Sequence, residues 1–146
     1  MTAPATICTG TTLLDLRNPR PGDIHIEDIA RGLARAPRFA GQTDVPLSVA
    51  EHCLLCETLA LMSGLAPRAR LAMLLHDAAE AYICDLPSPF KALLPEYCKA
   101  ERRILRAVFW RFELPVCNGY AVFDRNLDQI ACDIERRACF ASSLGQ

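Results

Sequence analysis

The spacing of apolar residues along the chain predicts a protein built almost entirely of helices. In several stretches apolar positions recur every three or four residues, which is the period of a helix with a buried face. Proline or glycine stands at most of the boundaries between these stretches. The expected helices cover residues 26–36, 46–63, 67–83, 95–112 and 119–141. This pattern indicates an all-α fold, a single-domain bundle of about five main helices.

The segments outside these helices carry weaker signals. Thr9-Gly10 lies between short β-prone pieces, which fits a small N-terminal hairpin and equally a fixed coil. Residues 84–91 contain two prolines, so we expect a stiff loop there that either contacts substrate or simply connects two helices. We divide the chain into an N-terminal arm (1–23), a helical domain (24–141) and a tail (142–146).

The central expected helix carries ionisable residues in an apolar setting. His76 and Asp77 are adjacent within the run from Leu71 to Glu80, which is otherwise small and apolar. Burying such side chains costs several kcal/mol unless they are paired or bound to a metal. Glu80 follows His76 by four residues, so a regular helix places both on the same side. The pattern therefore predicts a metal ion held by His76 and Asp77.

Composition and charge narrow the function classes. The chain has 146 residues, of which 51% are hydrophobic and 23% charged, as is typical of a globular domain. Its formal net charge of −1 argues against a nucleic-acid polymer as a partner, and leaves room for a small anion. No apolar run reaches the ~18 residues of a membrane span. The N-terminus also lacks the pattern of a signal peptide, so we expect a cytoplasmic protein with no membrane partner.

Cysteines are unusually frequent, with eight in the chain. Without a secretory signal, reduced thiols are expected rather than a disulfide framework. Cys53 and Cys56 form a C-x-x-C pair, a spacing found in zinc sites. The pair lies in an apolar helical run, and no second C-x-x-C or C-x-x-H completes four ligands. Both are therefore expected to pack in the core as small hydrophobic residues.

Other candidate residues are ambiguous when taken singly. His52 lies among apolar residues of the expected helix 46–63, where a lone histidine is more often a core residue than a ligand. Arg35 and Arg38 lie in a loop before that helix and, by themselves, read as solvated surface. Asp128 borders the apolar stripe expected in the last helix, which consists of Leu127, Ile130, Ala131, Ile134 and Ala138.

Together these motifs resemble the HD-domain superfamily of metal-dependent phosphohydrolases. The resemblance covers roughly residues 24–137 and is closest to bacterial 5′-deoxynucleotidases and phage deoxynucleoside triphosphate triphosphohydrolases. One departure is Cys84, where relatives commonly have glycine. The matching segments are Val49-Ala50-Glu51-His52, His76-Asp77-Ala78-Ala79-Glu80 and Asp85-Leu86-Pro87-Ser88-Pro89-Phe90-Lys91.

The resemblance implies a metal site and assigns its ligands. Asp128 is preferred to Asp124 because Asp128 precedes Glu135-Arg136-Arg137 by seven residues, as the family spacing suggests. A set of two imidazoles and two carboxylates suits Mn²⁺, Fe²⁺, Co²⁺, Ni²⁺ or Zn²⁺, with Mg²⁺ as an activator. The implied ligands are His52, His76, Asp77 and Asp128.

The resemblance also implies roles in catalysis and substrate binding. Glu80 is expected to act as general base or to orient the attacking water. Asp85 is expected to contact the sugar or to protonate the leaving 5′-oxygen. A guanidinium or ammonium group suits a phosphate. The expected substrate-binding residues are Arg38, Lys91, Arg35 and Ser88.

The expected function is hydrolysis of the phosphate ester at the 5′ position of a deoxynucleotide. The segment 35–43 and the compact size favour a triphosphate substrate, and a 5′-deoxynucleotidase acting on monophosphates is the alternative. Hydrolysis of cyclic nucleotides or alarmones ranks lower, as do a non-catalytic nucleotide-binding module and a wholly structural metal site. The expected partners are a small nucleotide and further copies of the chain in a homo-oligomer.

Overall fold

The computed structural model describes residues 5–118 and 120–140, and the expected tail lies outside them. At the N-terminus, β1 (Thr6–Cys8) pairs antiparallel with β2 (Leu13–Asp15). The Thr9 hydroxyl donates to the Thr12 carbonyl at 2.9 Å and accepts from the Thr12 N–H at 2.9 Å. These bonds close the turn, so the hairpin alternative is confirmed over the fixed coil.

The first two long helices follow the expected pattern. A short 3₁₀ helix, η1 (Pro21–Asp23), precedes α1 (Ile26–Arg35), which ends just before Pro37 as expected. A second 3₁₀ segment, η2 (Arg38–Gly41), leads to α2 (Val49–Met62). α2 begins after Pro46 rather than at it, because Ser48 takes the N-cap position and exchanges hydrogen bonds with Glu51 in a capping box.

The expected continuous helix over 67–83 is wrong. The chain forms α3 (Pro67–Leu74) and α4 (Glu80–Ile83), with tight turns between them. The His76 ring lies 2.7 Å from the Met73 carbonyl oxygen through Nδ1. In a continuous helix that oxygen accepts the N–H of residue 77. Because the His76 side chain takes this acceptor, the ladder of backbone bonds is interrupted at the HD pair.

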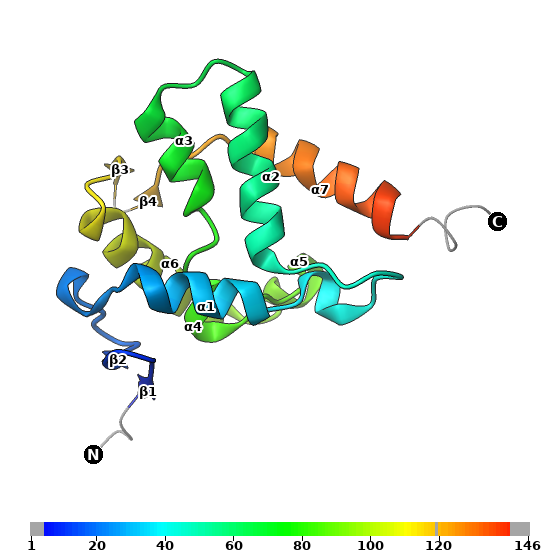
Figure 1. The fold of residues 1–146 in the computed structure, drawn as a ribbon. Coiled ribbons are helices and arrows are strands. Elements are labelled where there is room, and N and C mark those ends of the chain that lie inside the picture. The colour runs from blue at the N-terminus through cyan, green and yellow to red at the C-terminus, as the bar shows by residue number, and fades with distance from the viewer. Residues whose placement is uncertain (1–4, 119, 141–146) are drawn as a thin grey trace.

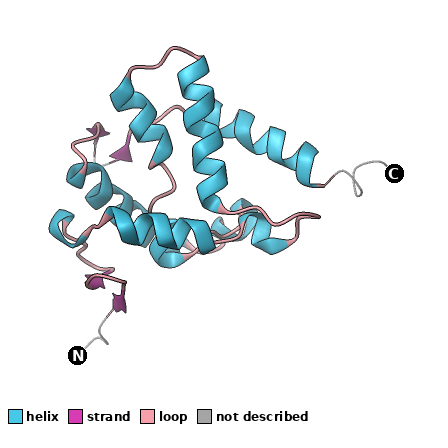
Figure 2. Ribbon diagram, in the orientation of Figure 1, coloured by secondary structure: helices cyan, strands magenta, loops and turns pink. Residues whose placement is uncertain are grey.

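The second half of the chain departs from the expected pattern in two places. The loop expected at 84–91 contains α5 (Ser88–Lys91), a single turn that tolerates Pro89 because its N–H is not needed there. α6 (Pro95–Arg111) matches the expected helix. A short hairpin of β3 (Val116–Cys117) and β4 (Tyr120–Ala121) then precedes α7 (Arg125–Cys139). The fold is therefore mostly helical, with two small two-stranded sheets in the described part (Figure 2).

The helices enclose two clusters of buried side chains. The larger cluster contains residues of the N-terminal segment, of α1, of the turns that follow α3, and of α6. In the smaller one α2, α3 and α7 pack around Cys56, Ala60, Met73, Leu127 and Ala131. α2 lies side by side with α3 and α7, as Figure 1 shows. None of the helices in the described part has the length and apolar composition that crossing a membrane requires.

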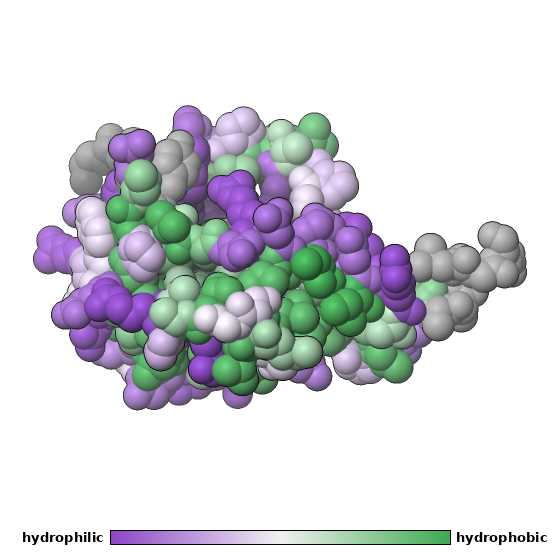
Figure 3. All heavy atoms as spheres, turned by 90° about the horizontal axis from the view of Figure 1, so that it is seen from above, coloured by the Kyte–Doolittle hydropathy of each residue, from purple (hydrophilic) through white to green (hydrophobic). Residues whose placement is uncertain are grey.

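The buried face of α7 differs from the expected stripe. Ile130 and Ile134 are exposed, whereas Glu135 and Cys139 point inward. Figure 3 shows apolar side chains gathered on one face of the molecule. The exposed large apolar residues of α2 and α7 are Leu54, Leu61, Met62, Ile130 and Ile134.

Candidate metal centre

Two buried histidines face one another across the interior of the fold. His52 comes from α2 and His76 from the turn after α3. His52 Nδ1 lies 2.8 Å from Glu135 Oε1, and His76 Nδ1 lies 2.7 Å from the Met73 carbonyl oxygen. A carbonyl oxygen only accepts, so the His76 proton is on Nδ1, and the Glu135 carboxylate favours the same tautomer at His52. The two Nε2 atoms then point at each other, 3.3 Å apart.

Two carboxylates complete the group around these nitrogens. Asp128 Oδ1 lies 3.1 Å from His52 Nε2 and 3.5 Å from His76 Nε2. Asp77 Oδ2 lies 3.6 Å and 3.3 Å from the same two atoms. Atoms that ligate one ion at about 2.0–2.2 Å lie roughly 3 to 3.5 Å from each other. The structure therefore brings His52, His76 and Asp128 together in one group that could hold a metal ion, and Asp77 lies within 3.6 Å of both Nε2 atoms.

The choice between the two aspartates of α7 follows from their positions. Asp124 is the N-cap of α7, and its side chain accepts the N–H groups of Asn126 and Leu127 at 2.9 and 3.3 Å. Asp128 lies one turn further on and faces the histidines. Asp124 thus serves the helix end, and Asp128 is the carboxylate available to a metal.

The electrostatics of this group favour a cation. Burial lowers the pKa of His52, but hydrogen bonds with Asp128, Cys56 and Glu135 outweigh this effect and raise the pKa to about 11. Burial raises the pKa of Asp128, and hydrogen bonds with His52 and His76 then lower it below its usual range. In the absence of a metal, a proton on the imidazoles is stabilised by the same negative groups that would bind a cation.

Glu80 lies beside the metal ligands and is almost fully buried. Its Oε1 accepts a hydrogen bond from Lys91 Nζ at 2.7 Å, and Lys91 also donates to Glu101 at 2.7 Å. Its Oε2 is buried without a hydrogen-bond partner among the described residues. Burial and the negative charge of Asp77 raise the pKa of Glu80 to about 9, although Lys91 acts in the opposite direction. In the metal-free protein this carboxyl group therefore holds a proton at neutral pH, and additional positive charge nearby would favour its release.

Arg38 connects the outer part of the site. Its Nη2 donates to Glu135 Oε2 at 3.1 Å, so Arg38 and His52 share one carboxylate. Its Nη1 lies 3.5 Å from Asp85 Oδ2 and 3.9 Å from Asp77 Oδ2. Burial raises the pKa of Asp85, and Arg38 opposes this shift. The guanidinium is therefore already matched with carboxylates in this structure.

Two hollows flank the candidate metal ligands. One has a volume of about 270 Å³ and includes Arg38, Asp85 and Ser88 in its lining. The other, of about 610 Å³, includes Phe123, Arg102 and Arg125 in its lining. The residues common to both are Asp77, Glu80, Lys91, Asp128 and Gln129. The arrangement provides separate space on each side of the metal ligands for the two parts of a phosphate ester.

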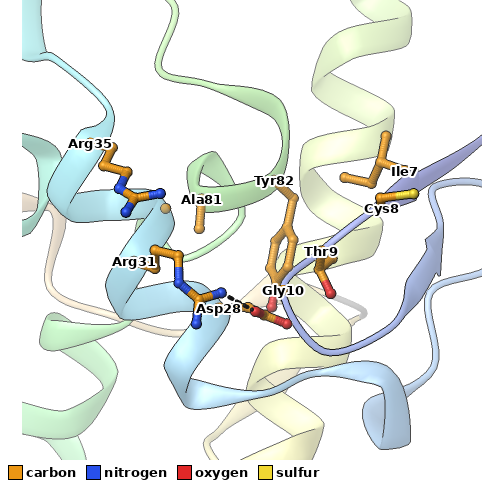
Figure 4. A pocket seen from close by; sticks show the side chains of 10 residues that line it. Ile7, Cys8, Thr9, Gly10, Asp28, Arg31, Arg35, Ala81 and Tyr82 are labelled. Atoms are coloured by element: carbon orange, nitrogen blue, oxygen red, sulfur yellow. Dashed lines mark hydrogen bonds and ion pairs between the residues drawn. The ribbon is translucent and has the colours of Figure 1, made fainter.

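Arg35, which was expected to contact substrate, lies apart from the candidate metal ligands. Arg35 lines a different pocket, between α1 and the N-terminal hairpin, whose lining contains none of the candidate metal ligands. Figure 4 shows Arg35 on the same helix as Arg31. Arg38 lies after the end of α1, and the turn at η2 redirects the chain, so closeness in sequence does not bring Arg35 to the same place.

Three residues of the site went unassigned in the sequence analysis. Glu135 served there only to set the spacing of Asp128, and the apolar pattern of the last helix gave no signal that this glutamate is buried. Glu101 fixes Lys91, and no local pattern distinguishes it from a surface charge. Cys56 is buried as expected, but its Sγ lies 3.5 Å from His52 Nε2.

Comparison with known proteins gives relatives without a described function. No protein-family model matches the chain. An uncharacterized protein of Rhodobacter capsulatus is 49% identical over 107 residues, which are 70% of this chain and 55% of that relative. The uncharacterized protein YfdR of Escherichia coli is 42% identical over 116 residues, which are 79% of this chain and 61% of that relative. The chain thus spans little more than half the length of these curated relatives.

Proposed function

We propose that this chain is an HD-domain, metal-dependent phosphohydrolase that cleaves the 5′ phosphate ester of deoxynucleotides. The observation that carries the proposal is the meeting of His52 Nε2, His76 Nε2 and two carboxylates beside Glu80, whose Oε2 has no protein partner among the described residues. A purely structural metal site would not require a buried glutamate held by Lys91 at the junction of two hollows.

The donor set fits a divalent transition metal. Both histidines present Nε2 and are fixed through Nδ1, as is usual for metal-binding imidazoles. Asp77 and Asp128 supply the negative charge that a dication requires. When bound, such an ion lowers the pKa of a coordinated water and offsets charge on the phosphoryl group.

The protein groups then account for the movement of protons. In its deprotonated form, which the positive charge of a bound metal ion would favour, Glu80 accepts a proton from the attacking water as the water oxygen bonds to phosphorus. The bond between phosphorus and the 5′-oxygen breaks, and Asp85 donates the proton that the leaving oxygen requires. The pKa of Asp85 is raised by burial, which favours a protonated form able to donate. The products are the deoxynucleoside and phosphate.

The charges around the site favour a monophosphate over the triphosphate expected from the sequence. Arg38 contacts three carboxylates, and Lys91 contacts two. Arg35, which was expected to help bind a triphosphate, lines a different pocket. Of the cations named for a triphosphate, Arg38 and Lys91 pair with carboxylates and Arg35 lies elsewhere, and on this ground we place the 5′-deoxynucleotidase reaction first. Arg102, Arg125 and Arg136 line the two hollows and are the residues that a triphosphate would have to use.

The test is hydrolysis of a panel of deoxynucleoside mono- and triphosphates with added Mn²⁺, Co²⁺ or Mg²⁺. Phosphate and triphosphate are separated as products, and Asp77→Asn serves as the variant that loses a metal ligand. Phosphate released from monophosphates by the wild type alone supports the proposal. Triphosphate release would instead restore the interpretation made from the sequence. No turnover of any substrate by metal-loaded protein would refute the enzyme and favour a binding module.

A further inference from the structure

One buried cysteine lies closer to the metal ligands than a core residue needs to be. Cys56 follows His52 by four residues on α2, so both side chains emerge on the same face of the helix. Its Sγ lies 3.5 Å from His52 Nε2. The donor atoms of Cys56, His52, His76 and Asp128 all lie within 4.8 Å of one another. Cys56 has no exposed surface.

The spacings match those between neighbouring ligands of one metal ion. Two imidazole nitrogens bound at about 2.0 Å lie about 3.3 Å apart, and a nitrogen and a sulfur bound at about 2.0 and 2.3 Å lie about 3.5 Å apart. In the structure, the two Nε2 atoms are 3.3 Å apart, and Nε2 of His52 is 3.5 Å from the sulfur. The Asp128 carboxylate completes this set at 3.1 Å from His52 Nε2.

Simple core packing is the alternative for Cys56. Its neighbours in the smaller cluster include Ala60, Met73, Leu127 and Ala131, and a buried thiol commonly acts as a small hydrophobic residue. Packing alone does not require the sulfur to lie against Nε2 of His52. The Nδ1 atom of His52 is already bonded to Glu135, so the nitrogen facing Cys56 is the metal-binding one.

We propose that the Cys56 thiolate is a further ligand of the metal, on its buried side, and that it biases the site towards Zn²⁺, Co²⁺ or Fe²⁺ over Mn²⁺ and Mg²⁺. Thiolates favour the softer ions, whereas sites of carboxylates and water suit the harder ones. On binding, the sulfur–metal bond replaces the S–H bond, and the thiol proton leaves to solvent. This inference rests on the metal-dependent hydrolase proposed above for the presence of an ion.

Cobalt substitution provides a readout that does not involve hydrolysis. The wild-type protein, Cys56→Ser and Cys53→Ser are titrated with Co²⁺ in the absence of free thiols, and absorption is recorded in the near-ultraviolet and visible ranges. Cys53 is the matched control because it is equally buried on the same helix and groups with His76 and Asp77. Circular dichroism establishes that each variant is folded.

The expected result is a sulfur-to-cobalt charge-transfer band in the wild type and in Cys53→Ser that is lost in Cys56→Ser. We also expect Cys56→Ser to lose at least about tenfold in affinity for Zn²⁺ relative to Mn²⁺, since even residues behind a ligand have effects of this size. If the wild type gives a visible cobalt spectrum without the charge-transfer band, the inference is overturned. This outcome is read from the wild-type protein alone and leaves the hydrolase proposal intact.

Two further outcomes would also overturn it. A band that persists in Cys56→Ser and disappears in Cys53→Ser would assign the sulfur ligand to the neighbouring cysteine. No cobalt binding by the wild-type protein would refute both this inference and the metal-dependent hydrolase.

Discussion

Two parts of the molecule bury a carboxylate near an arginine, and they differ in how completely the carboxylate is hydrogen-bonded. In the pocket beside the N-terminal hairpin, Asp28 accepts a hydrogen bond from the Thr11 hydroxyl and pairs with Arg31 at 3.0 Å. Burial raises the pKa of Asp28, but these bonds, with Thr9 and Gly10, lower it overall. Neighbouring residues therefore supply the hydrogen bonds of the Asp28 carboxylate, and we interpret Asp28 as a structural residue.

At the candidate metal centre the buried groups do not satisfy one another in this way. The Nε2 atoms of His52 and His76 face each other, and Glu80 Oε2 has no hydrogen-bond partner among the described residues. The comparison teaches that burial of an ionisable group does not by itself indicate function. What distinguishes the second region is a set of donor atoms directed at a common point with their other bonds already fixed.

The sharpest test of this contrast is Glu80→Gln. We expect kcat to fall by about 10²- to 10⁴-fold, the range for loss of a general base, because glutamine cannot accept the proton. The bound metal, measured by elemental analysis, should stay at the wild-type amount. Metal lost together with activity would mean that Glu80 is a ligand.

The next effect is expected at Glu135, which holds Nδ1 of His52. Glu135→Gln retains an oxygen acceptor but removes the charge, and we expect metal affinity to fall about 10- to 100-fold. Competition with a chelator of known affinity measures this change. The control is Glu57→Gln, whose carboxylate pairs with Arg70 away from the site, and which should bind metal as the wild type does.

Asp28→Asn should show the opposite pattern. Loss of charge at a buried, fully bonded carboxylate is expected to lower the free energy of unfolding by about 1 to 3 kcal/mol, measured by urea denaturation. Metal affinity and kcat/KM should not change. A loss of activity in folded Asp28→Asn would show that the two regions are coupled and would weaken the comparison.

The pH dependence of stability follows from Glu80 and His52. In the folded, metal-free protein the pKa of Glu80 is raised from 4.5 to about 9, and that of His52 from 6.5 to about 11. Between the two pKa values of each group, the folded protein holds a proton that the unfolded chain has released. The free energy of unfolding should therefore fall as the pH rises from 7 to 9, by up to about 1.4 kcal/mol per pH unit for each group.

Denaturation in a chelator at several pH values measures this slope. Glu80→Gln should reduce it, because one of the two groups no longer titrates. Saturating metal should also reduce it, because the ion takes the place of the proton on His52. A slope of the opposite sign would contradict the protonation states inferred for the site.

The smallest effect is expected at Arg35. Since this residue lines the pocket beside the N-terminal hairpin, Arg35→Ala should leave kcat/KM for the preferred nucleotide unchanged. Arg38→Ala provides the matched comparison and should reduce kcat/KM, because Arg38 contacts Asp85 and Glu135. Equal losses in the two variants would show that Arg35 reaches the substrate.

The sequence predicted the helices with strong periodicity and the residues that meet at the site. The ends of α1 and α6 are close to the predicted ones because proline marks them. The break before Glu80 was not predictable from periodicity, since it depends on a bond between the His76 ring and the Met73 carbonyl.

The rest depended on three-dimensional packing. The isoleucines of α7 suggested one inward face, yet the turn of the helix that carries Glu135 and Cys139 faces the core, because Glu135 is bonded to His52 and Arg38. The strands of the β3–β4 hairpin have only two residues each, too few to show an alternating pattern. The Asn118-Gly119 pair between them is typical of a hairpin turn, and the helix expected from residue 119 overlooked this signal.

The length of α7 connects two parts of the site, Asp128 and the segment that carries Arg38. Asp128 lies near the start of this helix, and Phe140 follows its last residue, about 18 Å along the axis at about 1.5 Å per residue. The Phe140 ring packs edge-on against Phe39, which adopts a left-handed backbone conformation next to Arg38. One helix therefore links Asp128, near its start, to the backbone beside Arg38, at its far end.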